Sequence, residues 1–453
     1  MSKKKSRFYL LTLGCPKNVV DSEGMSALLA GDGYRVTDDP ARADVLIVNT
    51  CGFLRAASDE SVGALRDLAA AKRSDQMLVA AGCMVQRFGA DLTRQVPGLD
   101  GLIGTRSWAD IVPFLQRLHT PHRREPIFHL PETGDVPIET APLVAPGRRA
   151  SASAYLKISD GCSAPCAFCT IPSFKGLGRS RPPDLILREA RALVAQGTQE
   201  LILIAQDTTA YGRDRGEQHG LVTLVEDLLP AVPDLRWLRL MYAYPGHVDQ
   251  RLIEVMAAHP QVCHYLDLPL QHGHPDTLRR MRRPHNVDSV LRWIEAFRAA
   301  MPDAALRTTF IVGYPGENEA EFQGLLDFMQ AVQFDRVGVF PFSREPGTPA
   351  HDLPDQVPDE VKQARYERAM ELQQAISLAK NQAQIGRRLD VLVDGAGEGV
   401  SIARSYRDAP EIDGFVVIEE ERPAARMLPA LVTGATVYDL IAVPADQPIM
   451  VME

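Results

Sequence analysis

Residues 161–169 of the chain read GCSAPCAFC and contain three cysteines, Cys162, Cys166 and Cys169. The segment follows a strand-like run at residues 155–159. A 4Fe–4S cluster normally takes four thiolates, so three cysteines in one tight loop would hold three irons and leave the fourth open to a small chelating molecule. A zinc site is the alternative, but it requires a fourth Cys or His nearby, and none lies in the loop.

The sequence around this loop predicts an open, partial (β/α)6 barrel over residues 151–382. Strand-like runs alternate with helical runs such as Leu185–Ala195 and Glu319–Val332, and they are too few for a closed eight-fold barrel. The cysteine loop follows the first strand, at the carboxyl-terminal mouth where such folds place their chemistry. The predicted strands are Tyr155–Ser159, Glu200–Ala205, Leu238–Tyr242, His264–Leu270, Thr308–Val312 and Val337–Pro341.

Residues 1–125 alternate in the same way and predict a doubly wound parallel sheet wrapped by helices. Three strand-like runs are each followed directly by a cysteine: Phe8–Gly14 by Cys15, Asp44–Thr50 by Cys51 and Met77–Gly82 by Cys83. Because the carboxyl ends of parallel strands lie along one edge of a sheet, these three cysteines are expected to converge and offer three further thiolates. The alternative is three unrelated buried cysteines.

Two further segments complete the predicted organisation. Residues 126–150 are rich in Pro, His and Arg and are predicted to be a linker. After a helix near Pro358–Gln384, residues 383–453 alternate Val, Leu and Ile with polar residues and Gly turns, which predicts a small all-β barrel. The remaining cysteine, Cys263, stands alone beside an apolar residue and is interpreted as a small buried side chain.

The composition is typical of a globular protein without a disulfide framework. The 453 residues include seven cysteines, an odd number, and carry a formal charge of −9. No apolar run approaches the roughly 18 residues that cross a bilayer. Lys3–Lys5 and the apolar residues after them faintly resemble a secretion signal, but the run continues into a helix pattern and is interpreted as a first strand. We therefore expect a cytoplasmic protein with no membrane partner.

The Cys-x3-Cys-x2-Cys spacing, with an aromatic residue before the last cysteine, resembles the signature of the radical S-adenosylmethionine (SAM) superfamily. The resemblance implies that the open iron binds SAM, from which a 5′-deoxyadenosyl radical is released. The segment GYPGE at residues 313–317 resembles the one that lines the nucleoside and methionine moieties, although an ordinary strand-to-helix turn would explain its acidic residue equally. The candidate SAM contacts are Phe168, Gln206, Gly313, Gly316 and Glu317.

Four short motifs make the resemblance more specific. TLGCPKN at residues 12–18, DSE at 21–23, NTC at 49–51 and GC at 82–83 resemble the N-terminal domain of the methylthiotransferase family. That family joins this domain to a radical SAM barrel and a C-terminal β-domain called TRAM, so the resemblance covers the whole chain in the same order. It implies two 4Fe–4S clusters, the N-terminal one for sulfur delivery, and two SAM per product. A low-potential electron donor is also implied, and the sulfur source, the cluster or a separate donor, stays open.

Two branches of the family differ in substrate. One modifies an adenosine in transfer RNA, and the other modifies the β-carbon of an aspartate in small-subunit ribosomal protein S-twelve. This chain resembles the aspartate branch in Pro16-Lys17, where the RNA branch usually has Gln-Met. DLPLQH at residues 267–272, QDT at 206–208 and PEIDG at 410–414 also resemble it. Lys175 departs from the usual Arg of the family, and Lys is not an equal substitute if that Arg grips a carboxylate.

The charge of the C-terminal segment favours the same branch. Residues 383–453 contain six Lys and Arg against twelve Asp and Glu. RNA affinity rests on neutralising phosphates with Lys and Arg, so we expect no specific nucleic-acid partner and a better fit to a basic ribosomal protein. A solvated acidic face kept for solubility is the alternative. Two other functions stay open: a transfer RNA-modifying enzyme with the same clusters, and an electron carrier, which would usually complete both clusters with four cysteines.

Overall fold

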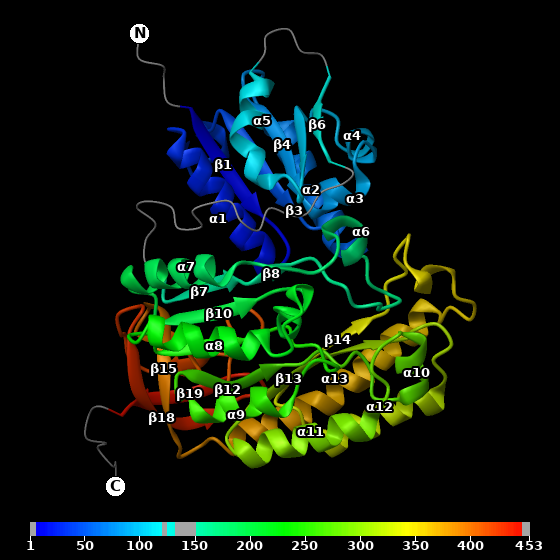
Figure 1. Cartoon of the computed structure of the whole chain (residues 1–453), viewed down its shortest axis with the longest axis vertical. Coiled ribbons are helices and arrows are strands. Elements are labelled where there is room, and N and C mark those ends of the chain that lie inside the picture. Colours follow the sequence, from blue (N-terminus) through cyan, green and yellow to red (C-terminus); the bar gives the residue numbers. More distant parts are fainter. Residues whose placement is uncertain (1–5, 120–124, 132–150, 446–453) are drawn as a thin grey trace.

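The computed structural model describes residues 6–119, 125–131 and 151–445 and shows three units in the order of the chain (Figure 1). The N-terminal domain lies on the central domain at the top of the view, and the C-terminal domain, orange to red, packs at the lower left. A parallel sheet, an open barrel and a closed β-barrel confirm the predicted fold class. Lys3–Lys5 and residues 132–150 of the predicted linker lie outside the described residues.

A six-stranded parallel sheet forms the N-terminal domain, in the order β2-β1-β3-β4-β5-β6. Alternate residues of each strand point to opposite faces, and both faces are covered by helices, as in a doubly wound fold. Its strands are β1 (Arg7–Thr12), β2 (Arg35–Val36), β3 (Val45–Thr50), β4 (Met77–Gly82), β5 (Gly101–Gly104) and β6 (Ile127–His129). The helices are α1 (Pro16–Gly31) and α5 (Ile111–Leu118) on one face, and α2 (Arg55–Ala71), α3 (Cys83–Phe88) and α4 (Asp91–Gln95) on the other.

Strands β5 and β6 differ from the sequence-based expectation. The sequence assigns residues 126–150 to a linker, but Ile127–His129 pairs in parallel with β5 and extends the sheet beyond residue 125. Strand β5 is only four residues long and has glycine at both ends, and β6 is only three residues long. Such short strands give too few residues for an alternation pattern, so only pairing to a preformed sheet reveals them.

Six parallel strands form the central barrel, which stays open between its first and last strand. Their inner faces join a core shared with the N-terminal and C-terminal domains, and their outer faces pack on helices. The strands are β7 (Ser153–Lys157), β10 (Glu200–Ile204), β11 (Trp237–Leu240), β12 (Val262–Asp267), β13 (Ala305–Val312) and β14 (Arg336–Pro341). The outer helices are α7 (Pro183–Ala195), α8 (Gly220–Ala231), α9 (Gln250–Ala258), α11 (Val287–Ala300), α12 (Glu319–Val332) and α13 (Asp359–Gln382).

Helix α12 illustrates why these segments become helices. Asn318 caps its start by accepting a hydrogen bond from the Glu321 backbone N–H at 3.0 Å. Phe322, Leu325 and Met329, spaced three and four residues apart, are fully buried against the barrel. The cap and the apolar stripe together account for the agreement between the predicted and observed bounds, Glu319–Val332.

The C-terminal domain is a closed five-stranded barrel in the order β15-β16-β17-β19-β18, which confirms the predicted small all-β barrel. Its alternating apolar residues point inward and form a separate core. The strands are β15 (Arg388–Gly397), β16 (Val400–Ser405), β17 (Val416–Ile418), β18 (Met427–Ala435) and β19 (Leu440–Pro444).

Buried ion pairs fix the C-terminal barrel to the amino-terminal ends of the central strands. Glu200, at the start of β10, accepts from Arg239 Nε at 2.7 Å and from Arg404 Nη1 of β16 at 2.8 Å. Burial alone would raise the pKa of Glu200, but these two guanidiniums lower it to about 2. Deeper in the barrel, Tyr265 Oη donates to Asp413 Oδ2 at 2.7 Å. The C-terminal domain therefore closes the floor of the central barrel, opposite the mouth.

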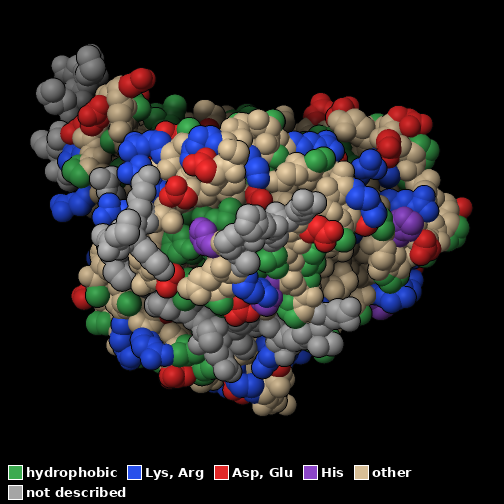
Figure 2. Space-filling view, turned by 90° about the horizontal axis from the view of Figure 1, so that it is seen from above, with side chains coloured by type: hydrophobic (Ala, Val, Ile, Leu, Met, Phe, Trp, Pro, Cys, Tyr) green, Lys and Arg blue, Asp and Glu red, His purple; other side chains and the backbone are tan. Residues whose placement is uncertain are grey.

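The outer surface seen in Figure 2 carries Lys and Arg side chains interspersed with Asp and Glu side chains, without one large basic area on that face. Across the described parts of the chain, no helix combines the length and apolar character needed to span a membrane.

Candidate active site between the two cysteine triplets

The first cysteine triplet lies at the carboxyl edge of the N-terminal sheet. Cys15 follows β1, Cys51 follows β3, and Cys83 begins α3 directly after β4. Because β1 and β4 flank β3, the three loops are neighbours. At Gly14, whose φ is +97°, a Cβ atom would lie 2.7 Å from Cys51 Cβ and 3.0 Å from Cys51 Sγ. Only glycine allows the Cys15 loop to approach Cys51 this closely.

Asn18, in the first turn of α1, connects the three loops. Its side-chain Nδ2 donates to the carbonyl oxygens of Leu13 at 2.8 Å and of Thr50 at 3.1 Å. Its Oδ1 accepts from Cys83 Sγ at 3.6 Å. Asn18 is 1% exposed, so its amide is used entirely within the loops that carry the cysteines.

The second triplet lies in the loop between the paired strands β8 (Ser159–Asp160) and β9 (Arg179–Ser180). Gly161 opens this loop with φ +73°, and a Cβ atom there would overlap the carbonyl oxygen of Leu177. The backbone N–H of Cys162 donates to the carbonyl oxygen of Gly176 at 3.1 Å. The loop that holds Cys162, Cys166 and Cys169 is therefore closed by its own hairpin.

Arg283 lies against this loop from the barrel. Its Nη1 donates to Cys166 Sγ at 3.6 Å, and its Nη2 donates to the carbonyl oxygen of Pro269. The guanidinium lies over the ring of Tyr244, 4.3 Å from the centroid. A positive charge in this position attracts an anionic group bound at the cysteine loop.

Both cysteine triplets line one cavity of about 350 Å³ between the N-terminal domain and the barrel mouth. All six cysteines that the sequence singles out are therefore brought together, three from each domain. Apolar and aromatic side chains form much of the remaining wall, and the polar groups are few. The wall includes Lys17, Asn18, Phe53, Phe168, Ile171, Phe174, Lys175, Gln206, Asp207, Tyr242, Tyr244 and Arg283.

The donor set of this cavity fits iron–sulfur clusters. Burial raises the pKa of the Cys162 thiol to about 11 and the pKa values of Cys83 and Cys169 to about 12, so without a metal these groups keep their protons at neutral pH. Iron binding replaces those protons. Two sets of three thiolates match two clusters that each keep one open iron. Cys263 is 2% exposed and does not line the cavity, which agrees with its interpretation as a buried side chain.

A buried group of four charges joins the two domains beside the cavity. Lys157 Nζ binds Asp21 Oδ1 at 2.5 Å and Asp160 Oδ2 at 2.9 Å. Lys175 Nζ binds the remaining Asp21 oxygen at 3.4 Å and Asp160 Oδ2 at 3.2 Å. Burial favours the neutral amine, but Asp160 and Asp21 raise the pKa of Lys175 well above its usual value. Lys175 therefore acts as a point charge between two carboxylates, a task that does not require the planar fork of Arg.

Lys17 reaches the same cavity from the turn after Cys15. Its Nζ lies over the ring of Tyr242, 2.9 Å from the centroid. Burial lowers the pKa of Lys17 to about 8. Tyr242 follows β11 and has φ +62°, a left-handed conformation that is strained for an aromatic residue.

Two of the five predicted SAM contacts, Phe168 and Gln206, line the cavity. Phe168 packs at the edge of a small apolar cluster that includes Tyr314 and Phe342. Gln206 Oε1 is buried and has no hydrogen-bond partner in the described residues. An unsatisfied buried oxygen that faces a cavity is a site for a donor group of a ligand.

The other three, Gly313, Gly316 and Glu317, do not line the cavity. Glu317 Oε2 accepts from the Gly313 backbone N–H at 2.9 Å, and its Oε1 accepts from Arg365 Nη1 at 3.0 Å. Its side chain is 0% exposed. The carboxylate thus closes its own turn, which is the alternative reading of this segment as a strand-to-helix turn.

Sequence reasoning did not assign roles to Asn18, Arg283 and Tyr242. Asn18 stands inside the quoted TLGCPKN motif, which was the available signal for it. Arg283 lies far along the chain from the cysteines, and nothing in its neighbourhood indicates a contact with Cys166. The left-handed backbone of Tyr242 leaves no mark in a sequence, because such positions usually hold Gly, Asn or Asp.

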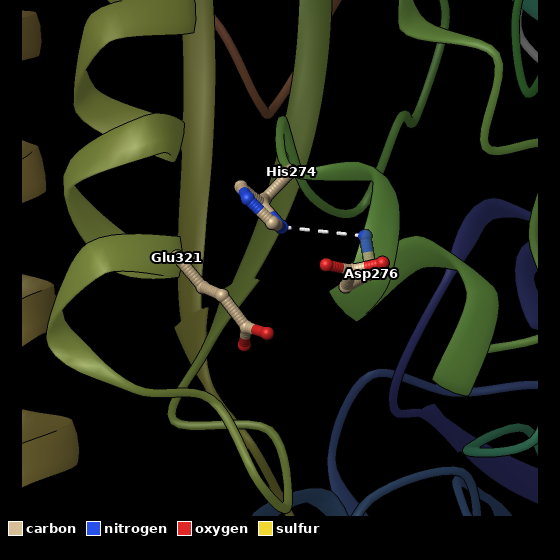
Figure 3. Close-up of side chains that lie close together, drawn as sticks. All are labelled: His274, Asp276 and Glu321. Carbon is tan, nitrogen blue, oxygen red and sulfur yellow. Dashed lines mark hydrogen bonds between the residues drawn. The ribbon is translucent and has the colours of Figure 1, made fainter.

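A group of side chains able to bind a metal lies outside the cavity and consists of His274, Asp276 and Glu321 (Figure 3). His274 Nδ1 accepts from the Asp276 backbone N–H at 3.3 Å and caps α10 (Pro275–Arg280). Glu321 Oε1 accepts from Arg280 Nη1 at 3.0 Å. Because a guanidinium already neutralises this carboxylate and the histidine serves as a cap, we assign no metal to the group.

Three family models match successive parts of the chain. Residues 7–104 match the Uncharacterized protein family UPF0004, residues 156–329 the Radical SAM superfamily, and residues 385–444 the TRAM domain. Among solved structures, the radical SAM methyltransferase TsrM from Kitasatospora setae gives a TM-score of 0.56 at 14% identity, covering 87% of this chain and 79% of that chain. At this identity the likeness shows the fold alone.

Curated relatives match over nearly the full length. The ribosomal protein uS12 methylthiotransferase RimO of Chloroflexus aurantiacus is 50% identical over 456 residues, covering 96% of this chain and 98% of that protein. RimO of a Roseiflexus species is 48% identical, with coverages of 97% and 98%. RimO of Symbiobacterium thermophilum is 44% identical, with coverages of 97% and 91%. Since these relatives span the same three domains, the chain belongs to the ribosomal protein uS12 methylthiotransferase (RimO) family of radical SAM enzymes.

Proposed function

We propose that this protein adds a methylthio group to the β-carbon of an aspartate in uS12, the small-subunit ribosomal protein S-twelve. The observation that carries the proposal is the single cavity that both cysteine triplets line. A hydrogen on an unactivated β-carbon is too weakly acidic for a side chain to remove at neutral pH, so general acid–base catalysis does not suffice. The reaction needs a radical to remove this hydrogen and a sulfur atom to replace it. A cavity lined by two cysteine triplets has room for one cluster that serves each purpose.

The two ends of the cavity are suited to different tasks. When bound, SAM and the cluster on Cys162, Cys166 and Cys169 supply radical chemistry, and the cluster on Cys15, Cys51 and Cys83 supplies sulfur. Gln206 offers its free Oε1 to an ammonium or hydroxyl group of SAM, and Phe168 walls the same end. The apolar remainder of the wall excludes water, which protects a reactive carbon centre from side reactions.

The balance of the reaction defines the co-reactants. The C–H bond of the β-carbon breaks, and its hydrogen atom leaves in 5′-deoxyadenosine derived from one SAM. A C–S bond forms at that carbon, and a second SAM gives the sulfur its methyl group and leaves as S-adenosylhomocysteine. Joining a carbon radical to an anionic methylsulfide releases one electron, which the cluster on Cys15, Cys51 and Cys83 would accept. A low-potential electron donor is required for the first SAM, and a sulfur donor renews the sulfur. A ribosomal protein substrate supports a reaction in the cytoplasm.

The excess of acidic residues in the C-terminal barrel supports a basic protein as the partner. The support is weaker than the count of charged residues in the sequence indicates. Asp408 is buried against Arg336 at 2.7 Å, and Asp413 is buried against Arg307 at 3.3 Å. These carboxylates serve the contact between domains. Others are exposed and keep the outer barrel surface acidic, namely Asp390, Glu398, Glu411, Glu419 and Glu421. This surface favours a basic protein over a phosphate backbone.

Mass spectrometry of uS12 from cells with and without the gene tests the substrate. We expect one aspartate to carry about 46 Da more in cells that contain the gene, the increment of a methylthio group that replaces hydrogen. Transfer RNA from the same cells is analysed in parallel. An unmodified aspartate in both strains, together with loss of a methylthio group from a transfer RNA adenosine, contradicts the proposed substrate.

Single cysteine variants separate the two halves of the mechanism. Cys162→Ala is expected to abolish both 5′-deoxyadenosine formation and methylthiolation, because SAM loses its cluster. Cys83→Ala is expected to abolish methylthiolation while 5′-deoxyadenosine still forms from SAM. Iron content is measured beside both products, and Cys263→Ala, remote from the cavity, is the control that should retain all three. If Cys162→Ala and Cys83→Ala lost 5′-deoxyadenosine formation to the same extent, the two clusters would not have separate roles in radical formation and sulfur delivery.

A further inference from the structure

Lys17 lies buried in the active-site cavity, and no carboxylate of the described residues binds it directly. It is 6% exposed and lines the cavity between the two cysteine triplets. The other two lysines near the cavity, Lys157 and Lys175, each bind two carboxylates. No carboxylate within residues 6–119, 125–131 and 151–445 forms an ion pair or hydrogen bond with Lys17. Asp267 favours the charged form of Lys17 from a distance, but its carboxylate binds Arg307 Nη1 at 2.7 Å and the Tyr242 backbone N–H at 3.1 Å instead. Burying an ammonium with no carboxylate bound to it costs free energy, so the folded protein keeps Lys17 there against its own stability.

The aromatic ring that Lys17 contacts belongs to a residue with an unusual backbone conformation. Its Nζ lies over the ring of Tyr242, and Tyr242 keeps φ +62°. The Tyr242 backbone N–H donates to Asp267 Oδ2 at 3.1 Å, and its carbonyl oxygen accepts from the Thr208 backbone N–H at 3.0 Å. A strained conformation of this kind persists only where several contacts fix it, and such positions cluster at functional sites. These backbone hydrogen bonds fix the position of the Tyr242 ring, and the Lys17 ammonium lies over that ring.

The proposed substrate supplies the missing charge. An aspartate side chain carries its carboxylate one bond from the β-carbon that reacts. We propose that Lys17 binds this carboxylate, holds the β-carbon between the two cysteine triplets, and thereby selects aspartate over neutral side chains. This inference rests on the proposed function, since a different substrate would bring a different group to Lys17.

The chemistry of the ammonium agrees with such a role. An ammonium offers three donors around one point of charge, so it can follow a carboxylate while the adjacent carbon changes geometry. A charge-assisted hydrogen bond in a cavity with few polar groups is stronger than one in water.

The test compares Lys17→Met with Lys17→Arg in the reconstituted holoenzyme. The probes are a peptide with the uS12 loop sequence and the same peptide with asparagine in place of the target aspartate. The KM of the aspartate peptide and the inhibition constant of the asparagine peptide are measured, and their ratio gives the preference for aspartate. We expect Lys17→Met to raise the KM at least tenfold and to reduce the preference at least tenfold, while Lys17→Arg keeps most of the preference.

Two controls distinguish selection from a structural role. Iron content and 5′-deoxyadenosine formation without peptide report whether both clusters and SAM binding survive in Lys17→Met. Lys72→Met removes a lysine of the same domain that binds Asp100 at 2.5 Å at the opposite edge of the sheet, and it should leave the preference unchanged.

An unchanged preference for aspartate in Lys17→Met overturns the inference while leaving the proposed function intact. Loss of iron from Lys17→Met that accounts for its lost activity also overturns it and assigns Lys17 to cluster retention. If the wild-type enzyme neither binds nor modifies the aspartate peptide or intact uS12, the proposed function itself fails.

Discussion

At the scale of single residues, the cavity depends on side chains that bridge loops as much as on the cysteines. Asn18 uses both amide hydrogens and its oxygen to connect the loops of the first triplet. A buried amide with all its hydrogen bonds formed defines one arrangement of its neighbours, because each alternative leaves a polar group unsatisfied. Asn18 therefore helps to fix the three loops that carry the thiols of the first triplet.

Asn18→Ala is expected to lower the unfolding free energy by about 1–3 kcal/mol, because two carbonyl groups lose their donor. It should also reduce the iron held by the first triplet and leave 5′-deoxyadenosine formation in place. Urea unfolding and iron analysis measure the two effects. Asn318→Ala, which removes the cap of α12, should cost about 1 kcal/mol without loss of iron. Full iron retention in Asn18→Ala would contradict the bridging role.

Individual residues could be predicted from the sequence when their chemistry allowed few other roles. Six cysteines at strand ends or in one tight loop have an obvious use as metal ligands, and the structure places all six around one cavity. Glu317 is different, because a carboxylate after a glycine turn serves the turn as readily as a ligand, and here it binds Gly313 and Arg365. The role proposed for Lys17 depends on the absence of a directly bound carboxylate among the described residues, which only the folded structure shows.

At the scale of elements, short helix α3 links the N-terminal cluster site to the barrel. It begins at Cys83 and carries Arg87, whose Nη1 binds Glu345 Oε2 at 2.9 Å in the segment after β14. The other oxygen, Glu345 Oε1, accepts from the Arg55 backbone N–H at the start of α2 at 2.8 Å. One carboxylate of the barrel thus holds two helices of the N-terminal domain over the cavity.

Glu345→Gln should destabilise the contact between the domains by about 3–5 kcal/mol, because Arg87 stays buried without its counter-charge. We expect faster hydrogen exchange in α2 and α3 and faster loss of iron to a chelator. The exposed pair Glu319–Arg368 offers a matched control, and Glu319→Gln should cost less than about 1 kcal/mol and leave exchange in α2 and α3 unchanged. Identical exchange in Glu345→Gln and wild type would show that other contacts hold the domains together.

Elements with long, regular patterns were predictable, and most short ones were not. Helix α12 and strand β13, with eight residues, have enough residues for their periodicity to be recognised, whereas the four-residue strand β11 was placed by the helical runs on either side of it. Strand β6, with three residues, depends on its pairing with β5. The contact between α3 and the segment after β14 joins residues more than 250 positions apart, and no local pattern encodes such a pairing.

At the scale of the whole molecule, a network of buried ion pairs joins the C-terminal barrel to the central barrel. Glu200 is central to it, because its carboxylate lies between Arg239 and Arg404. The acidic residues of the C-terminal segment were interpreted from the sequence as a surface for a basic partner, but two of them, Asp408 and Asp413, pair with Arg336 and Arg307 of the central barrel instead. The count of charges was available from the sequence, and their division between interface and surface required the fold.

Glu200→Gln should lower the unfolding free energy by about 3–5 kcal/mol at pH 7, because two buried guanidiniums lose their carboxylate. The pKa of Glu200 falls from 4.5 to about 2 in the folded protein, so its stabilising effect is complete above pH 4.5 and is lost as the pH falls towards 2. The difference in unfolding free energy between wild type and Glu200→Gln should therefore become smaller as the pH falls from 4.5 towards 2.

Anaerobic urea unfolding of both proteins between pH 7 and pH 3 measures this difference. Glu226→Gln, on an exposed position of α8, is the control and should show a small difference from wild type at every pH. A gap between wild type and Glu200→Gln that stays constant down to pH 3 would contradict the assignment.

The closed floor of the central barrel limits how substrates and products reach and leave the cavity. Arg239, Tyr265 and Asp413 fill the end of the barrel that lies opposite the cysteines. Small molecules and the protein substrate are then expected to approach from the mouth, where both cysteine triplets line one cavity. A ribosomal protein loop seated there stands in the way of fresh SAM and of the spent nucleoside beneath it. The protein substrate is therefore expected to arrive last and to leave first, so that each catalytic cycle runs in a compulsory order.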